Sequence, residues 1–279
     1  MKRFIWVAAA AAIATACSSS SPTEPSGSSS SGSVALAQFS TSVVTFAGGA
    51  SVQGTLLLDR AAPAGGTDVT IRSSNPRAKV PSSVHVVDGA SNATFWIHTE
   101  PLDAPADVTI TATGARVART VVLHLTVGSF ITFASEAGEP IGRGENDGVG
   151  IDTAEFTAAV YFQQNTFRVQ VLRRTPTVEF WMLEIAAPRG QPLLPGHYDG
   201  AVRSVSRTGA QPGLDFSAKG LGCSFLTGSF DVIEADYGGP GTVFDSLTIN
   251  RFRARFTQRC SSSTQALTGD VRILMNPWR

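Results

Sequence analysis

Residues 67–99 read TDVTIRSSNPRAKVPSSVHVVDGASNATFWIHT, and this stretch decides the fold. It contains three runs rich in β-branched and aromatic residues, separated by the turn dipeptides Asn-Pro and Asp-Gly. In the last run, Phe95 and Ile97 alternate with Trp96 and His98. A period of two is typical of a half-buried strand, so we expect Phe95 and Ile97 to face a core.

The same pattern extends over residues 34–128, with glycine-rich turns between short apolar runs. Strands are predicted at 42–46, 50–58, 67–73, 83–87, 93–99, 108–113 and 119–127. Short strands at this regular spacing indicate an antiparallel β-sandwich.

Residues 129–279 are also rich in β-formers, and no stretch has a helical period. Strands are predicted at 130–135, 154–163, 166–174, 177–186, 197–203, 228–235, 243–258 and 266–275. We expect one antiparallel β-sandwich or jelly-roll-like domain of about eight strands, which makes the whole chain all-β.

The first 17 residues have the organisation of an export signal. Lys2 and Arg3 precede an apolar run at 4–13, and the small residues 14–16 lead directly to Cys17. The apolar run is too short to cross a bilayer, which takes about 20 apolar residues.

A cysteine directly after small residues resembles the lipobox of bacterial lipoproteins, although Ala14 stands where the family usually has leucine. The resemblance implies that the thiol of Cys17 is diacylated, with palmitate among the lipids, and that Cys17 becomes the mature N-terminus. Ser18 after it implies sorting to the outer membrane. We therefore expect a lipid-anchored protein of the bacterial cell envelope, periplasmic or surface-exposed. The alternative is an ordinary secretory signal cleaved near the same point.

Residues 18–33 read SSSSPTEPSGSSSSGS and contain no apolar side chain. Such a segment cannot offset the entropy of ordering, so we expect a disordered linker. Its r.m.s. length of about 20 Å would hold residues 34–128 away from the membrane.

If Cys17 carries lipid, the chain retains Cys223 and Cys260, an even pair in an oxidising compartment. A bridge between them closes a loop of nearly 40 residues and contributes about 4 kcal/mol on the chain-entropy model. A metal or redox site would instead favour CxxC spacing or nearby histidines, and the sequence has neither.

The strings VQGTLLLDRAAPAGGT at 52–67 and VTITATGARVARTVVLHLTV at 108–127 resemble a bacterial surface immunoglobulin-like domain. The resemblance covers about 34–128 and implies a spacer or adhesive module without catalytic residues. Residues 34–128 contain no cysteine, so apolar packing must stabilise them.

The strings WMLEIAAPRGQPLLPGHYDGAVR at 181–203 and FRARFTQRC at 252–260 are similar to an uncharacterised secreted β-module of bacterial envelope proteins. The resemblance implies a domain over about 129–279 and supports the pairing of Cys223 with Cys260. It implies no activity.

The chain has 22 basic and 22 acidic residues, nearly balanced within each half, which disfavours generic nucleic-acid binding. His85, His98, His124 and His197 belong to no metal or catalytic motif, and the GxSxG motif is absent. We expect surface histidines without a role, and no cofactor.

The segment GRGENDGVG at 142–150 is loop-like and acidic. Oxygen donors at Glu145, Asn146, Asp147 and Asp152 could hold Ca²⁺. The spacing does not match an EF-hand loop, so a plain solvated loop is the main expectation and no metal is assigned.

Arg251, Arg253 and Arg255 alternate with apolar residues, which places three guanidinium groups on one strand face. They could bind the carboxylates or phosphates of an anionic glycan. The alternative is a solvated face paired with acids such as Asp231 or Glu234.

Trp181, next to Phe180, is an ambiguous aromatic residue. An exposed Trp181 or Trp96 could stack on sugar rings, whereas a buried one would belong to the core. A glycosidase would need two carboxylates about 5–10 Å apart, and the sequence cannot select a pair.

Three functions are therefore open. The first is a non-enzymatic envelope lipoprotein that presents a β-rich module to an envelope polysaccharide or a surface protein. The second is a hydrolase acting on envelope polymers, with its site in 129–279. The third is a structural accessory subunit of a surface assembly.

Overall fold

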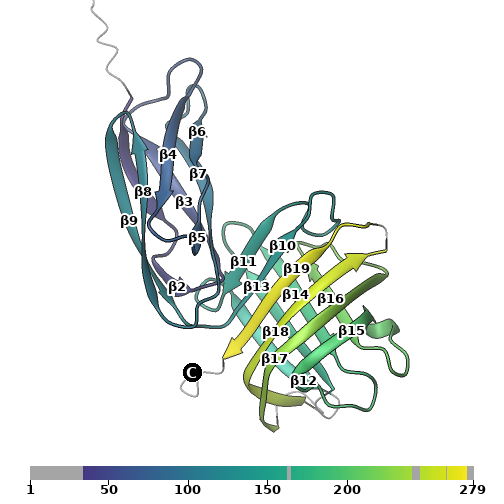
Figure 1. The fold of residues 1–279 in the computed structure, drawn as a ribbon. Coiled ribbons are helices and arrows are strands. Elements are labelled where there is room, and N and C mark those ends of the chain that lie inside the picture. The colour runs from purple at the N-terminus through teal and green to yellow at the C-terminus, as the bar shows by residue number, and fades with distance from the viewer. Residues whose placement is uncertain (1–33, 162–164, 241–245, 262, 275–279) are drawn as a thin grey trace, which may run out of the picture. The chain divides into compact units, whose positions relative to one another are not determined.

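The computed structural model describes residues 34–161, 165–240, 246–261 and 263–274 (Figure 1). Residues 34–279 form one compact unit built almost entirely of strands, which confirms the all-β fold class. The signal sequence, Cys17 and the linker at 18–33 lie outside the described residues. Within the described ranges, the chain contains no helix of the length and apolarity needed to traverse a bilayer.

Strands β1 to β9 form the N-terminal sandwich. One sheet has the order β1-β3-β7-β5, with β1 (Leu36–Thr41), β3 (Ser51–Leu58), β7 (Asn92–Thr99) and β5 (Ala78–Lys79). The other has the order β2-β9-β8-β4-β6, with β2 (Thr45–Ala47), β9 (Val117–Thr126), β8 (Ala106–Gly114), β4 (Thr67–Ser73) and β6 (Ser83–Val86). The pairing of β2 with β9 is parallel, and the other pairs of these sheets are antiparallel.

The core of the N-terminal sandwich follows the predicted alternation. Phe95 and Ile97 are buried, while Trp96 and His98 are half-buried on the other face. Phe39 of β1 stacks on Phe95, with ring centroids 5.8 Å apart. The predicted strand face is confirmed.

The sequence did not predict strand β1. Leu36 and Phe39 are both buried although they are three residues apart. The pairing of β1 with β3 shifts by one residue between Leu36 and Gln38, and such a bulge breaks the period of two. Alternation of buried and exposed residues is what predicts a strand from sequence, so β1 was not predicted.

Strands β10 to β19 form the C-terminal sandwich. They are β10 (Phe130–Ser135), β11 (Asn146–Gly150), β12 (Glu155–Tyr161), β13 (Thr166–Arg173), β14 (Glu179–Ala186), β15 (Gly196–Arg203), β16 (Gly213–Ala218), β17 (Leu226–Pro240), β18 (Ser246–Cys260) and β19 (Leu267–Leu274). They make one sheet of order β11-β10-β19-β18-β12-β13-β14-β16-β15-β17, and β17 also pairs with β18. The pairing of β17 with β18 closes the sheet into a ring, and the opposite sides of this ring form the two layers of the C-terminal sandwich (Figure 1).

Aromatic side chains fill the space between the two layers. Phe133 of β10 packs against Trp181 of β14, with ring centroids 5.2 Å apart. Phe167 of β13 stacks on Phe252 of β18 at 3.9 Å. These fully or nearly fully buried rings form the centre of the second core.

Two strands of the C-terminal sandwich were not predicted, β11 and β16. Strand β11 lies inside the segment 142–150, which we expected to be a loop. Its DGVG sequence has little strand propensity, but β10 pairs with it along its whole length. Tertiary pairing therefore overrides local preference.

The predicted disulfide is present between Cys223 and Cys260, whose Cα atoms are 5.3 Å apart. Both cysteines are buried. The bridge ties the loop before β17 to the last residue of β18, at the point where Leu226 and Cys260 begin the pairing of these strands. It fixes the longest strand pair of the C-terminal sandwich at one end.

The two sandwiches contact each other through backbone groups and arginines. The Asp152 carboxylate accepts a hydrogen bond from the backbone N–H of Ala47 at 3.0 Å. Arg272 donates to the carbonyl oxygens of Leu102 at 2.7 Å and Gly128 at 2.9 Å. The predicted boundary between 128 and 129 falls in the segment between β9 and β10, next to these contacts.

Gly148 of β11 lies against the backbone of Gly49. A Cβ atom at position 148 would lie 2.0 Å from the Gly49 carbonyl oxygen. We expect Gly148→Ala to lower the free energy of unfolding by about 1–3 kcal/mol, because backbone must shift to admit the methyl group. Urea unfolding of the full chain measures this loss.

Gly239→Ala is the matched control, because a Cβ atom there meets nothing within 4 Å. It should leave the unfolding midpoint near that of the wild type. Equal midpoints for Gly148→Ala and Gly239→Ala would contradict the close contact.

Candidate functional site

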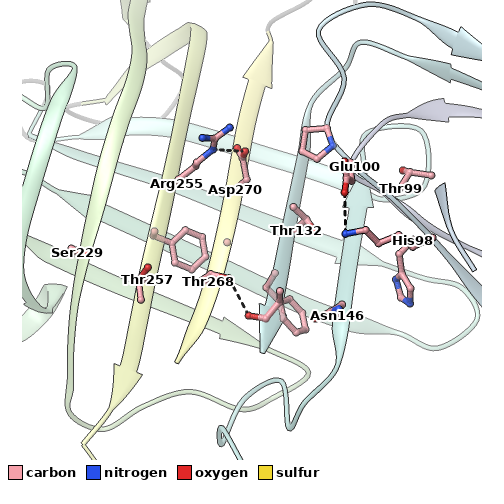
Figure 2. A pocket seen from close by; sticks show the side chains of 16 residues that line it. His98, Thr99, Glu100, Thr132, Asn146, Ser229, Arg255, Thr257, Thr268 and Asp270 are labelled. Atoms are coloured by element: carbon pink, nitrogen blue, oxygen red, sulfur yellow. Dashed lines mark hydrogen bonds and ion pairs between the residues drawn. The ribbon is translucent and has the colours of Figure 1, made fainter. Parts of the chain in front are cut away.

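The candidate site is a groove of about 460 Å³ on the outer face of β10, β18 and β19 (Figure 2). We call it the junction groove. Its floor carries small polar or short side chains: Thr132, Ala134, Ser229, Thr257 and Thr268. Residues 98–101, at and after the end of β7, together with Lys79, form the wall contributed by the N-terminal sandwich.

A glycine of β19 makes room for a buried aromatic ring next to the floor. A Cβ atom at Gly269 would lie 2.2 Å from the ring of Phe256, so only glycine allows this ring to lie against β19. Phe256 and Phe133 both contribute to the groove although their rings belong to the core. The floor therefore carries hydroxyl groups at its surface, and the two aromatic rings lie buried beneath it.

Ion pairs lie at the two ends of the groove. Arg255 Nε is 3.1 Å from a carboxylate oxygen of Asp270, and Lys79 Nζ is 2.9 Å from Glu100 (Figure 2). Each of these carboxylates already has a cation as its partner. These groups can orient a polar ligand by hydrogen bonds.

The arginine stripe has the predicted geometry, because Arg251, Arg253 and Arg255 share the outer face of β18 while Phe252 and Ala254 are buried. The three side chains do not act as one cluster.

Each arginine of the stripe has a different environment. Arg251 pairs with Glu234 at 3.2 Å, as the alternative interpretation expected. Arg253 is largely buried and contacts Asp103 at 3.2 Å and Asp270 at 3.4 Å. Of the three, only Arg255 lines the junction groove.

Trp181 is fully buried, which corrects its interpretation as an exposed sugar platform. Its indole N–H donates to Glu179 at 3.2 Å, and its ring packs on Phe133. Phe180 is the exposed member of the pair. The sequence could not decide which of the two aromatic residues is buried, because either one could face the core from this strand.

Two of the weak Ca²⁺ candidates, Glu145 and Asp147, meet at the ammonium group of Lys219, at 2.8 and 3.5 Å. Asp147 also pairs with Arg173 at 2.7 Å, and the third candidate, Asp152, accepts the Ala47 N–H. Among the described residues, no three His, Cys, Asp or Glu side chains gather in a group that could hold a metal ion. The acids serve as partners of cations and backbone instead.

Arg173 is the most deeply buried of these cations. It contacts Asp147 at 2.7 Å and Glu179, and its guanidinium lies 5.5 Å from the Trp96 ring and 5.4 Å from the Trp181 ring. Burial by itself lowers the pKa of Arg173, but the two carboxylates outweigh it and raise the pKa. The network therefore holds a permanent charge beside the N-terminal sandwich.

Three of the four histidines are exposed and hydrogen-bond to aspartates on neighbouring strands: His85 to Asp68, His124 to Asp107 and His197 to Asp231. His98 differs, because it is half-buried at the junction groove and its Nδ1 lies 2.8 Å from the Ser51 hydroxyl. Burial lowers the pKa of His98 below its usual 6.5.

This lowered pKa predicts a pH dependence of stability. The unfolded chain binds a proton at His98 near pH 6.5, while the folded protein binds it only at lower pH. The stabilising contribution is therefore present above about pH 6.5 and is lost as the pH falls below it. Between about pH 8 and pH 5, the wild type should lose more stability than His98→Gln in urea unfolding. The same loss in both proteins would contradict the assignment.

Two buried carboxylates form a pair that the sequence did not select. Glu184 of β14 and Asp215 of β16 lie opposite each other, and burial raises the pKa of Asp215. Each is held by an arginine: Arg168 Nε donates to Glu184 at 2.8 Å and Arg203 Nε to Asp215 at 3.0 Å. The pair is part of an ion network on the outer face of the sheet, and Asp215 does not line the junction groove.

Comparison of the chain with known protein-family models and with curated proteins finds no match. The protein is therefore described by its own fold and by the groove on its surface. It is an all-β protein with two sandwiches, a disulfide in the second, and a groove where residues from both meet.

Proposed function

We propose that the protein is a non-enzymatic lipoprotein of the bacterial cell envelope whose junction groove binds a glycan. The observation that carries this is the composition of the groove floor, where threonine and serine hydroxyls line the surface. Sugars present many hydroxyl groups, and such a floor can exchange hydrogen bonds with them. The ion pairs at the ends supply further donors and acceptors.

The N-terminal sandwich supports a role as an immunoglobulin-like spacer. Its sheet order β1-β3-β7-β5 corresponds to strands A, B, E and D of that fold, and β9-β8-β4 corresponds to G, F and C. In this proposal it also contributes one wall of the groove through residues 98–101.

The envelope location rests on the leader and on the disulfide. The apolar run before Cys17 and the Ser-rich segment at 18–33 fit an acylated, tethered protein. A buried bridge between Cys223 and Cys260 fits an oxidising compartment outside the cytosol.

A hydrolase is less well supported by the geometry. Glu184 and Asp215 are neighbours, as a pair of catalytic carboxylates would be, but both are bound by arginines and mostly covered. In the junction groove, Glu100 and Asp270 are each committed to a cation. Binding a ligand requires no change in these ion pairs. Hydrolysis would require at least one of the carboxylates to separate from its cation and act as an acid or a base.

The anchor is tested by Cys17→Ala in the full chain expressed in a bacterial host. The substitution removes the thiol that would be acylated, so the protein should move from the membrane fraction to the soluble fraction. Fractionation and immunoblotting measure the shift. Cys223→Ser is the control for cysteine loss and should leave the protein with the membranes. Membrane association that survives Cys17→Ala would refute the anchor.

Glycan binding is tested by filling the groove. Thr268 is exposed on the floor, so Thr268→Trp should reduce binding of any glycan captured on an array by about tenfold or more, because the indole occupies the ligand volume. Thr157→Trp is the control, since Thr157 is also exposed on a strand of the C-terminal sandwich but does not line the groove.

Two outcomes would overturn the glycan proposal. Undiminished binding in Thr268→Trp would place the ligand elsewhere on the protein. Capture of no glycan by the wild type, together with a protein crosslinked through the groove, would favour the accessory-subunit role.

A further inference from the structure

A second pocket of about 460 Å³ lies on the C-terminal sandwich and shares no residue with the junction groove. It lies between the β14–β15 loop and the segment from the end of β15 through the short 3-10 helix at Ser204–Ser206. Three arginines line it: Arg168, Arg189 and Arg207. We call it the arginine pocket.

Arg207 is half-buried, and its hydrogen bonds go to uncharged oxygens. Its Nη1 donates to the Ser204 hydroxyl at 2.9 Å, and its Nη2 donates to Thr166 Oγ1 at 3.2 Å and to Asn165 Oδ1. Its Nε is buried and has no hydrogen-bond partner. Among the described residues, no carboxylate lies within ion-pair distance of Arg207.

Arg189 is exposed at the mouth of the pocket. Its Nε donates to the Arg207 carbonyl oxygen at 3.2 Å, and no described carboxylate pairs with it. The pKa of Arg207 is lowered first by burial and then by repulsion from Arg189, with a smaller opposing effect of Glu184. The two guanidinium groups are therefore close enough to repel each other.

The carboxylate that lines the pocket already accepts hydrogen bonds from protein groups. Of the described lining residues, Glu184 is the sole carboxylate, and it accepts hydrogen bonds from Arg168 at 2.8 Å and from the Ser204 hydroxyl. Glu184 can thus balance Arg168, which leaves the charges of Arg189 and Arg207 uncompensated. A partly buried charge without a counter-ion is unfavourable, and an anion between the two would relieve it.

We propose that the arginine pocket binds the oxyanion of a small ligand between Arg189 and Arg207. Guanidinium groups bind carboxylate and phosphate oxygens in this way, often with two parallel hydrogen bonds. The volume lies in the range of small-molecule pockets, so there is room for the body of the ligand as well as for its charged group. The ligand class is an acidic sugar or a phosphate compound, because both carry the oxyanion that the site lacks.

The test is isothermal titration of the full chain with three probes: sodium glucuronate, glucose as its neutral counterpart, and inorganic phosphate. At least one anion should bind, and any binding of glucose should be unchanged by Arg189→Gln. Arg189→Gln should weaken anion binding about tenfold or more, because it removes one charge and its donors. Added salt should also weaken binding, since one of the two arginines is exposed.

The variants separate loss of the site from loss of the fold. Arg189 is exposed and makes one hydrogen bond, so Arg189→Gln should keep the wild-type melting temperature. Arg207→Gln should also abolish binding, and its melting curve shows whether it folds. Arg174→Gln is the control, because Arg174 is exposed and pairs with Glu155 away from the pocket.

The two anions distinguish the source of the ligand. Binding of glucuronate alone supports an acidic sugar, and binding of phosphate alone supports a phosphate compound. The proposal fails if neither anion binds, or if the affinity is the same in Arg189→Gln as in Arg174→Gln.

Discussion

The contact between Gly148 and the carbonyl oxygen of Gly49 is the constraint on which the candidate site depends. Strand β11 can lie directly against the backbone of the N-terminal sandwich because it has no side chain at this point. Arg272 and Asp152 then bind backbone groups on the other side of the junction. As a result, residues 98–101 lie beside β10 and β19, and the junction groove has a wall as well as a floor.

Arginines organise the C-terminal sandwich, and their partners distinguish structural from available charges. Arg173 is enclosed by Asp147 and Glu179, and Arg253 contacts Asp103 and Asp270. A buried charge that has its partners stabilises one arrangement and offers little to a ligand. Arg189 and Arg207 have no such acid among the described residues, and the two line the same pocket.

The two pockets suit different ligands. The junction groove has hydroxyl groups and balanced ion pairs, so it favours an extended polar ligand without a required charge. The arginine pocket is smaller in its set of lining residues and carries excess positive charge.

The sequence by itself determined the all-β class, most strands, the buried face of β7 and the disulfide, because each leaves a local mark: a period of two, a turn dipeptide or an even pair of cysteines. It could not determine β1, whose bulge breaks the period, or β11, which is a strand because β10 pairs with it. Only the tertiary structure decided that Trp181 is buried while Arg255 lines a groove. The period of two assigns each residue to one of the two faces of its strand. It does not show which other part of the protein covers that face. The sequence also could not show which acid pairs with which arginine. Arg253 contacts Asp103, which is 150 residues away in the chain, and Arg207 pairs with no acid among the described residues.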